Sequence, residues 1–147
     1  MLLAVSLRLA IAEDLDSIQR LYSYVIGPPT GQERTWSRLI SDGCLVVAEV
    51  SGQIAGFGGI DTNAVEQLKW LYVMPEFQGA GVGSELLKQL EAIGWARGLA
   101  AIRLHAAPGA FVFYRKHGYR EVERDDVAHD HEGIVMVKEI SPHFGRS

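Results

Sequence analysis

The sequence feature that most constrains the fold is a glycine-rich turn, Gln78-Gly79-Ala80-Gly81-Val82-Gly83, followed by Ser84. A strand-like run that ends at Pro75 precedes it, and a run with the apolar spacing of a helix follows it. The first turn of a helix leaves backbone N–H groups without partners, and the helix dipole adds about half a positive charge there. Because glycine lets an anion approach such amides closely, the turn is a candidate phosphate site. The same glycines would also suit a tight turn that only packs a helix.

Two common phosphate-binding motifs do not fit this turn. The P-loop pattern G-x-x-x-x-G-K-[ST] needs a lysine, and no lysine stands in that place. The dinucleotide pattern G-x-G-x-x-G, counted from Gly79, would put its third glycine one residue after Gly83. The turn therefore predicts an anion at a helix start and leaves the identity of that anion open.

Apolar spacing predicts strands and helices along the rest of the chain. Strand-like runs cover residues 5–11, 45–50, 54–61, 65–74, 101–106, 119–123 and 134–140. Helical spacing covers the runs from Leu15 to Val25, from Trp36 to Ile40, from Leu86 to Ile93 and over residues 108–117. Asp14 or Glu13 is expected to cap the first helix, and Gly27-Pro28-Pro29 to end it.

The order of these elements predicts an α+β fold with a mixed, largely antiparallel sheet. Ser51-Gly52 is expected to join two strands as a hairpin. The sheet should become parallel around the long helix after the glycine turn. In the run 65–74, the spacing of Leu68 and Leu71 breaks strict alternation, which predicts a bulge near Trp70-Leu71. The length of 147 residues fits one domain.

Composition argues against several classes of protein. The formal charge is −4 and the 14 lysines and arginines are scattered, so no basic face for nucleic acid is expected. Cys44, the only cysteine, lies in an apolar run, which indicates a buried strand residue rather than a nucleophile. The apolar start from Leu2 to Val5 is too short for a signal peptide or a membrane span. A cytoplasmic protein without a membrane partner is the default expectation.

Two segments resemble the motifs of the GNAT superfamily of N-acetyltransferases. The stretch from Leu71 to Gly83 is similar to the family's acetyl-CoA motif, [Gln/Arg]-x-x-Gly-x-[Gly/Ala] after a strand with a Val-x-Pro end. Gln78, Gly81 and Gly83 match its fixed positions. The segment from Phe113 to Tyr119 resembles the family's Phe-Tyr-x-x-x-Gly-Phe signature. The gap between the two segments also fits, and both motifs together make the resemblance specific.

The resemblance implies a GNAT-like three-layer fold, in which the sheet splays beside the strand before the glycine helix and acetyl-CoA lies in the gap. The backbone of Leu71, Tyr72 and Val73 would hold the pantetheine arm, and the amides after Gln78 would hold the pyrophosphate. The Val73 N–H would face the acyl oxygen, where such a donor is worth about 10²–10³ in rate. Relatives often carry an asparagine before the Phe-Tyr pair that helps hold the arm, but this sequence has Ala107-Pro108-Gly109-Ala110 there.

On the same resemblance, an amine attacks the thioester directly, and Tyr114 serves as an acid for the departing thiolate or orients it. From the sequence alone, Tyr114 could instead only pack beside Phe113 in a core helix. The base that deprotonates the amine is less well defined. The family's glutamate position falls on Gln67, with Glu66 beside it, and His105 is a further candidate. Either Gln67 orients a water, or the bulge turns Glu66 toward the site.

Several functions therefore stay open at the level of sequence. The first is acetyl transfer to a primary amine of a small molecule or a peptide, the second is a module that binds acyl-CoA without catalysis, and the third is a nucleotide-binding fold. The cluster Asp125, Asp126, His129, Asp130 and His131 is interpreted as a solvated loop or as a lip that selects a cationic substrate, because the family uses no metal. Dimerisation is common in the family, so a homodimer is compatible with the resemblance.

Overall fold

A seven-stranded sheet with the order β1-β2-β3-β4-β5-β7-β6 forms the centre of the computed structural model, which describes residues 4–122 and 133–140. The strands are Val5–Leu9 (β1), Leu45–Val50 (β2), Gln53–Ile60 (β3), Leu68–Val73 (β4), Ala101–Ala106 (β5), Arg120–Glu121 (β6) and Ile134–Glu139 (β7). Neighbouring strands are antiparallel except β4 and β5, which are parallel. The predicted α+β class with a mostly antiparallel sheet is confirmed.

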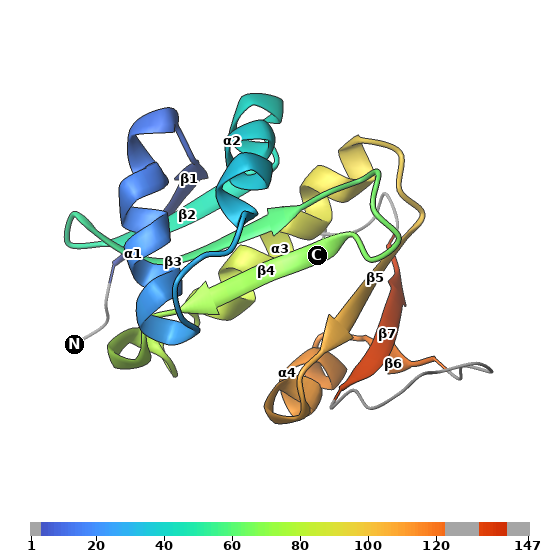
Figure 1. The fold of residues 1–147 in the computed structure, drawn as a ribbon. Coiled ribbons are helices and arrows are strands. Elements are labelled where there is room, and N and C mark those ends of the chain that lie inside the picture. The colour runs from blue at the N-terminus through green and yellow to red at the C-terminus, as the bar shows by residue number, and fades with distance from the viewer. Residues whose placement is uncertain (1–3, 123–132, 141–147) are drawn as a thin grey trace.

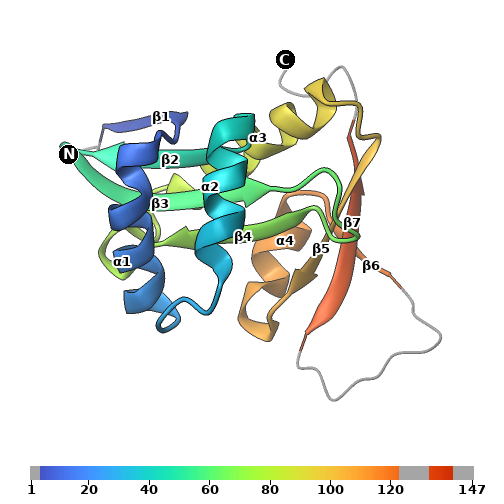
Figure 2. The same ribbon diagram turned by 45° about the horizontal axis from the view of Figure 1, so that its top comes forward.

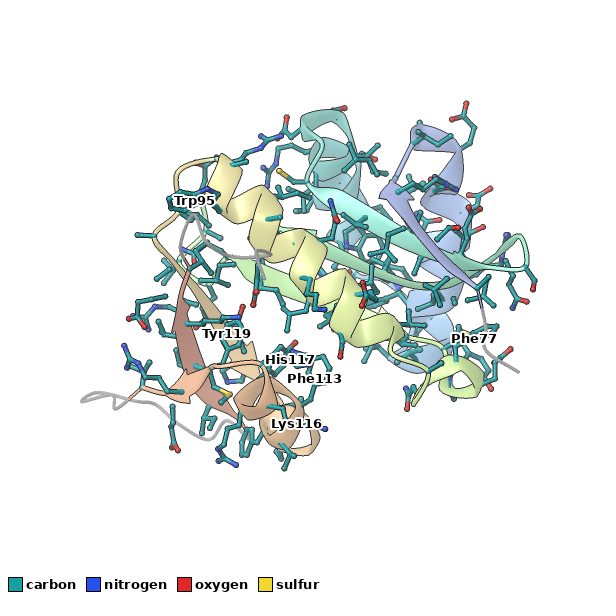
Figure 3. All side chains as sticks on the ribbon, turned by 180° about the vertical axis from the view of Figure 1, so that it is seen from behind. Phe77, Trp95, Phe113, Lys116, His117 and Tyr119 are labelled. Carbon is teal, nitrogen blue, oxygen red and sulfur yellow. The ribbon has the colours of Figure 1, made fainter. Side chains whose placement is uncertain are left out.

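Helices cover both faces of the first four strands. The α-helices are Leu15–Val25 (α1), Gln32–Asp42 (α2), Val82–Ala96 (α3) and Phe111–Lys116 (α4), and short 3₁₀ turns cover Ala12–Asp14 (η1), Pro75–Phe77 (η2) and Pro108–Ala110 (η3). Figures 1 and 2 show α1 and α2 on one face of β1 to β4 and α3 on the other. Seen from behind, α4 lies on the same side as α3 (Figure 3). Within the described ranges, no helix is both long enough and apolar enough to cross a membrane.

An aromatic cluster forms the core beneath α1 and α2. Trp36 of α2 is fully buried, and its ring meets those of Tyr22, Phe57 and Trp70 edge-on at centroid distances of 5.2, 5.6 and 6.1 Å. Such edge-to-face pairs stabilise a core beyond the burial of their area. The Trp36 Nε1 atom finds no hydrogen-bond partner in the described part of the chain.

On the opposite face, glycines of β3 let α3 approach the sheet closely. A Cβ atom on Gly56 would stand 3.2 Å from Leu86 Cδ1, and one on Gly58 would stand 2.6 Å from Leu90 Cδ1. Side chains at these positions would push the helix away, because protein interiors have no spare volume. The apolar face of α3, with Leu86, Leu87 and Leu90, is therefore fully buried against the sheet.

The sheet splays between β4 and β5, as the resemblance implied. Leu68 and Leu104 form the only registered pair between these two strands, and β4 continues to Val73 without its parallel neighbour. Figure 1 shows the two strands diverging from that point. The predicted bulge is present but lies earlier in the strand. Gly59 pairs with Trp70 and Ile60 with Leu68, which leaves Lys69 as the extra residue.

Several element boundaries differ from the sequence prediction. The predicted strand 5–11 ends at Leu9, because the η1 turn begins at Ala12. The predicted strand 65–74 begins at Leu68 and ends at Val73. Within the predicted strand 119–123, the described strand residues are Arg120 and Glu121.

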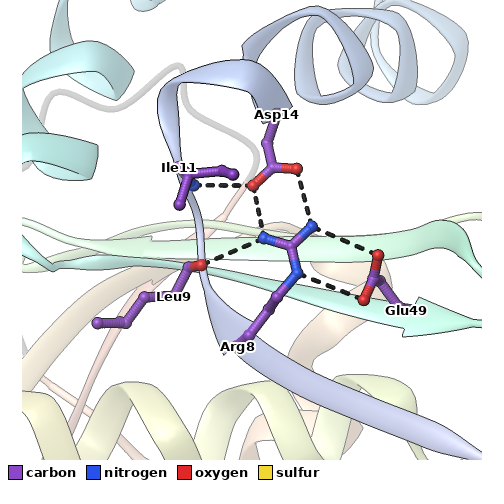
Figure 4. Close-up of polar contacts among 5 residues, drawn as sticks. All are labelled: Arg8, Leu9, Ile11, Asp14 and Glu49. Carbon is purple, nitrogen blue, oxygen red and sulfur yellow. Dashed lines mark hydrogen bonds and ion pairs between the residues drawn. The ribbon is translucent and has the colours of Figure 1, made fainter.

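Asp14 precedes α1 as predicted but does not cap it through its side chain. Its carboxylate instead accepts hydrogen bonds from the Ile11 N–H at 2.8 Å and from Arg8 at 2.7 and 2.9 Å. Arg8 also pairs with Glu49 of β2 at 3.3 Å (Figure 4). These contacts tie β1, β2 and the start of α1 together.

Candidate active site

A cleft of about 510 Å³ opens between the end of β4, the turn after it and α4. Three separate segments supply its lining residues: Leu71, Val73, Gln78, Gly79, Gly81, Val82, Gly83, Ser84, Gly109, Ala110, Phe113, Tyr114 and Lys116. The cleft therefore brings together the two sequence motifs that carried the resemblance. A larger open hollow beside α1, of about 740 Å³, includes Asp16, Tyr24 and Glu33 and none of the predicted site residues.

The glycine turn directs free backbone amides at this cleft. Gly79 and Gly81 both have a φ of 85°, a conformation that other residues rarely adopt. α3 begins at Val82, and its first backbone bond runs from the Glu85 N–H to the Gly81 carbonyl at 3.1 Å. The N–H groups from Val82 to Ser84 consequently have no partner within the helix. This geometry suits an anion at a helix N-terminus.

The open edge of β4 borders the cleft. The Met74 N–H donates to the Ala55 carbonyl of β3 at 2.8 Å. Since backbone groups alternate along a strand, the N–H and carbonyl of Val73 point away from β3, toward the side that β5 has left. The side-chain amide of Gln78 donates to that Val73 carbonyl at 3.0 Å, which agrees with this direction. Gln78 thus fastens the glycine turn to the end of the strand.

Two of the predicted cofactor residues do not line the cleft. The Tyr72 ring points to the opposite face of the sheet, where it packs against Tyr22 and Phe57 at centroid distances of 5.6 and 5.8 Å. Its backbone pairs with β3 rather than with the open edge. Ala80 is exposed, and its N–H donates to the Phe77 carbonyl at 3.4 Å. The roles predicted for both residues stay predictions.

Tyr114 lines the cleft and also belongs to the core. Its ring packs between Phe113, at a centroid distance of 5.1 Å, and Tyr119, at 5.6 Å. Burial, and secondarily the nearby Tyr72, raise the pKa of Tyr114 well above its ordinary value. The hydroxyl therefore keeps its proton at neutral pH and can donate a hydrogen bond into the cleft.

None of the three predicted bases lines the cleft. Gln67 lies just before β4, and its side chain donates to the Ala64 carbonyl at 3.0 Å and accepts from the Arg103 N–H at 2.9 Å. Gln67 thus bridges the point where β4 and β5 still meet. Glu66 is half-buried in the preceding turn, and His105 is exposed on β5. The identity of the base stays a prediction.

The structure adds cleft residues that the sequence reasoning did not select. Phe113 and Lys116 come from α4, and Gly109 and Ala110 stand where the asparagine of relatives was expected. The Phe113-Tyr114 motif was the available signal for them. Its helical spacing does not say which side of the helix faces the glycine turn.

The other candidate centres give no site in the described residues. The cluster Asp125, Asp126, His129, Asp130 and His131 lies outside them. In the ranges 4–122 and 133–140, no three His, Cys, Asp or Glu side chains are grouped to hold a metal ion. Cys44 is buried as predicted, and burial raises the pKa of its thiol.

Solved structures share this fold. One is the PaiA N-acetyltransferase from Thermoplasma acidophilum in complex with coenzyme A, with a TM-score of 0.72, 19% identity, and coverage of 93% of this chain and 99% of that one. Another is a GCN5-related N-acetyltransferase from Kribbella flavida, with a TM-score of 0.70 and 20% identity over 81% of this chain. The present chain covers 33% of that second protein. At these identities the two structures establish the fold alone.

Sequence comparison gives the family. The chain is 30% identical over 104 residues to an uncharacterized N-acetyltransferase from Archaeoglobus fulgidus, a match that covers 58% of this chain and 70% of that protein. Residues 28–140 match the family model described as an acetyltransferase (GNAT) domain. Because that match extends over most of the chain, the protein belongs to the GNAT acetyltransferase family.

Proposed function

We propose that this protein is an acetyl-CoA-dependent N-acetyltransferase that acts on a primary amine of a small molecule or a peptide. The observation that carries the proposal is that one cleft joins the amides of the glycine turn, the open edge of β4 and Tyr114. The similar Thermoplasma acidophilum protein, described in complex with coenzyme A, supports the same class of ligand. A single domain over residues 1–147, a cytoplasmic location and a homodimer remain predictions of the sequence.

The cleft fits the parts of acetyl-CoA in order. The amides of Gly79 and of residues 81 to 84 would hold the pyrophosphate, and Lys116, which also lines the cleft, would add a cation. Leu71 and Val73 would give the pantetheine arm an apolar wall and a strand edge. When bound, acetyl-CoA supplies the activated thioester, and the protein supplies position and hydrogen bonds.

Two groups would act on the reacting atoms. The Val73 N–H donates to the acyl oxygen, where negative charge develops as the amine attacks. Tyr114 donates a hydrogen bond to the leaving sulfur. Because an ordinary thiol has a pKa of about 8.5, below that of a buried tyrosine, stabilisation of the thiolate by this hydrogen bond precedes any complete proton transfer.

One observation favours the alternative function, an acyl-CoA-binding module without catalysis. Among the described residues that line the cleft, no side chain is a carboxylate or a histidine. A protonated amine must lose a proton before attack, so catalysis needs Glu66, a water held by Gln67, or His105 to act from beyond the cleft.

Release of free CoA in the presence of an amine panel tests the proposal. The panel includes polyamines, amino acids, aminoglycosides and peptide N-termini. We expect turnover with at least one member, and Tyr114→Phe should lower kcat about 100-fold, in the range of a lost acid–base group. Tyr24→Phe is the matched control, because Tyr24 is exposed on α1 and outside the cleft. Binding of CoA without any turnover would favour the module, and tighter binding of ATP or NAD than of CoA would refute both functions.

A further inference from the structure

A hydrogen bond that the proposed reaction does not use connects α3 to the end of α4. The Oγ atom of Ser84 lies 3.0 Å from the Nε2 atom of His117. Ser84 is the third residue of α3 and lines the cleft, while His117 directly follows α4. Seen from behind, His117 and Phe113 lie together on the side of α4 that faces α3 (Figure 3).

The surrounding contacts fix the position of His117. Its ring packs on Phe113 at a centroid distance of 4.7 Å, and its backbone N–H donates to the Tyr114 carbonyl at 3.0 Å. Phe113 in turn stands 3.5 Å from the place where a Cβ atom on Gly83 would be. His117 therefore cannot move without displacing residues of the cleft wall, and it meets Ser84 from a fixed direction.

The direction of this hydrogen bond decides what Ser84 can offer to a ligand. A serine hydroxyl has one proton, and a neutral imidazole has one N–H. When His117 carries its proton on Nε2, it donates to the Ser84 oxygen, and the Ser84 proton is free for a ligand oxygen. The other tautomer would take the Ser84 proton for itself and leave a lone pair toward the cleft. A bound anion favours the first arrangement, because it needs a donor.

We propose that His117 is a positioning residue for the phosphates of coenzyme A: it donates an Nε2–H hydrogen bond to Ser84, so that the Ser84 hydroxyl donates to a pyrophosphate oxygen. The inference rests on the proposed function, since it needs coenzyme A in this cleft. His117 touches no reacting atom. Through Ser84, it links the segment after β5 to the start of α3, where the pyrophosphate would bind.

The charges around His117 predict how this contribution depends on pH. Burial lowers the pKa of His117, and the facing charges are Glu91 and Lys88 on α3, Lys116 on α4 and Lys138 on β7. Glu91 raises that pKa and the three lysines lower it. A pyrophosphate bound at the turn adds negative charge and raises it. The part of the affinity that comes from the positive charge of His117 is therefore full below the pKa of the free protein and is lost as pH rises through the pKa of the complex, while the Nε2–H hydrogen bond of the neutral ring persists.

Titrations with two ligands test the inference. The first ligand, 3′-dephospho-coenzyme A, keeps the pyrophosphate but lacks the phosphate monoester of coenzyme A. That monoester has a second pKa of about 6 and would add its own pH dependence. The second, S-acetylpantetheine, has no phosphate. His117→Phe keeps the ring but cannot donate, so we expect about fivefold weaker binding of the first ligand and unchanged binding of the second. Ser84→Ala should match this loss, and the double variant should add nothing to it.

A pH series separates positioning from simple packing. The affinity of the wild-type protein for 3′-dephospho-coenzyme A should fall as pH rises from about 5.5 to about 8, following the sign derived from linkage. His117→Gln offers an amide donor that does not titrate, so it should recover part of the affinity and remove the pH dependence. Arg115→Gln removes a cation from α4 outside the cleft lining and should behave like the wild type.

Three results would overturn the inference. If His117→Phe weakened the binding of both ligands equally, His117 would have only a structural role. Unchanged binding of both ligands would show that the pair positions nothing. A wild-type protein that binds neither ligand would refute the proposed function together with this inference, and that outcome is visible before any variant is made.

Discussion

The two halves of the sheet are held together in different ways. β1 to β4 are covered by helices on both faces (Figure 2). Large side chains such as Trp36, Phe57 and Leu90 are fully buried between the layers. β5, β6 and β7 join them through one strand pair, Leu68 with Leu104. Strand pairing is continuous through the first half, whereas the second half is held by that one pair and by apolar side chains, such as Ile102 and Met136, that belong to the same core cluster.

Polar contacts add to this apolar packing between the two halves. Glu91 of α3 is buried, and it accepts hydrogen bonds from the Tyr119 hydroxyl at 2.8 Å and from Lys138 Nζ at 3.0 Å. Gln67 bridges to Arg103 at the closed end of the gap. A slot for an extended ligand can therefore open within one sheet, because shared core packing and specific polar contacts take the place of strand pairing there.

The largest effect is expected in the aromatic core of the first half. Trp36→Ala should lower the free energy of unfolding by about 3–5 kcal/mol, since it leaves a large cavity among buried aromatic rings. Trp36→Phe is the matched control. It removes the N–H that has no partner among the described residues and keeps most of the volume, so its loss should be about 1–2 kcal/mol. Urea unfolding measures both, and equal losses would mean that the cavity is not the cause.

An intermediate effect is expected where the second half is attached. Glu91→Gln should cost roughly 2–3 kcal/mol, because it removes the buried charge that pairs with Lys138 Nζ at 3.0 Å, and partial exposure of Lys138 limits the loss. Hydrogen exchange should accelerate in β5 and β7 more than in β2 and β3. Arg120→Gln is the control, because the Arg120–Glu139 pair is exposed and contributes little. Uniform acceleration throughout the sheet would contradict the distinction between the halves.

The smallest effect is expected at the far edge of the first half. Arg8, and then the Ile11 N–H, hold the pKa of Asp14 below its usual value. A lowered folded-state pKa gives stability that is present above the unfolded pKa of about 3.9 and is lost as pH falls through the folded pKa. Asp14→Asn should therefore be roughly 1–2 kcal/mol less stable at pH 7, an amount reduced by the partial exposure of Arg8.

Urea titrations of the wild type and Asp14→Asn from about pH 7 down to about pH 2 measure this difference. The gap in the free energy of unfolding should close below about pH 4. Affinity for CoA should not change, because β2 and β3 separate β1 from β4. A gap that persists at low pH would assign the loss to packing rather than to charge.

The order of elements and much of the cleft could be predicted because they depend on local sequence. The glycine turn, the apolar face of α3 and the Phe113-Tyr114 pair each lie within one continuous segment, where spacing and backbone preference fix the structure. The splay between β4 and β5 came from the family resemblance and not from spacing.

Contacts between distant segments could not be predicted in the same way. The spacing of Leu68 and Leu71 breaks the strand alternation, and an extra residue at more than one position could restore it. Pairing with β3 places that residue at Lys69. Gln67 bonds to a backbone group 36 residues away, and Ser84 pairs with a side chain 33 residues away. Such partners depend on how two elements are oriented, which neither element's periodicity records.

Two unpaired strand edges, one of β4 and one of β5, face each other across the gap between these strands. Beyond Leu68, β4 pairs with β3 alone, and its other edge faces the gap (Figure 1). Unpaired edges are templates for pairing with other chains, and proteins usually protect them with charge, proline or a covering element. Here the second half of the sheet provides the cover. A variant that loosens that half would expose the facing edges of β4 and β5 at once, so we expect it to aggregate through intermolecular β-pairing before its core unfolds.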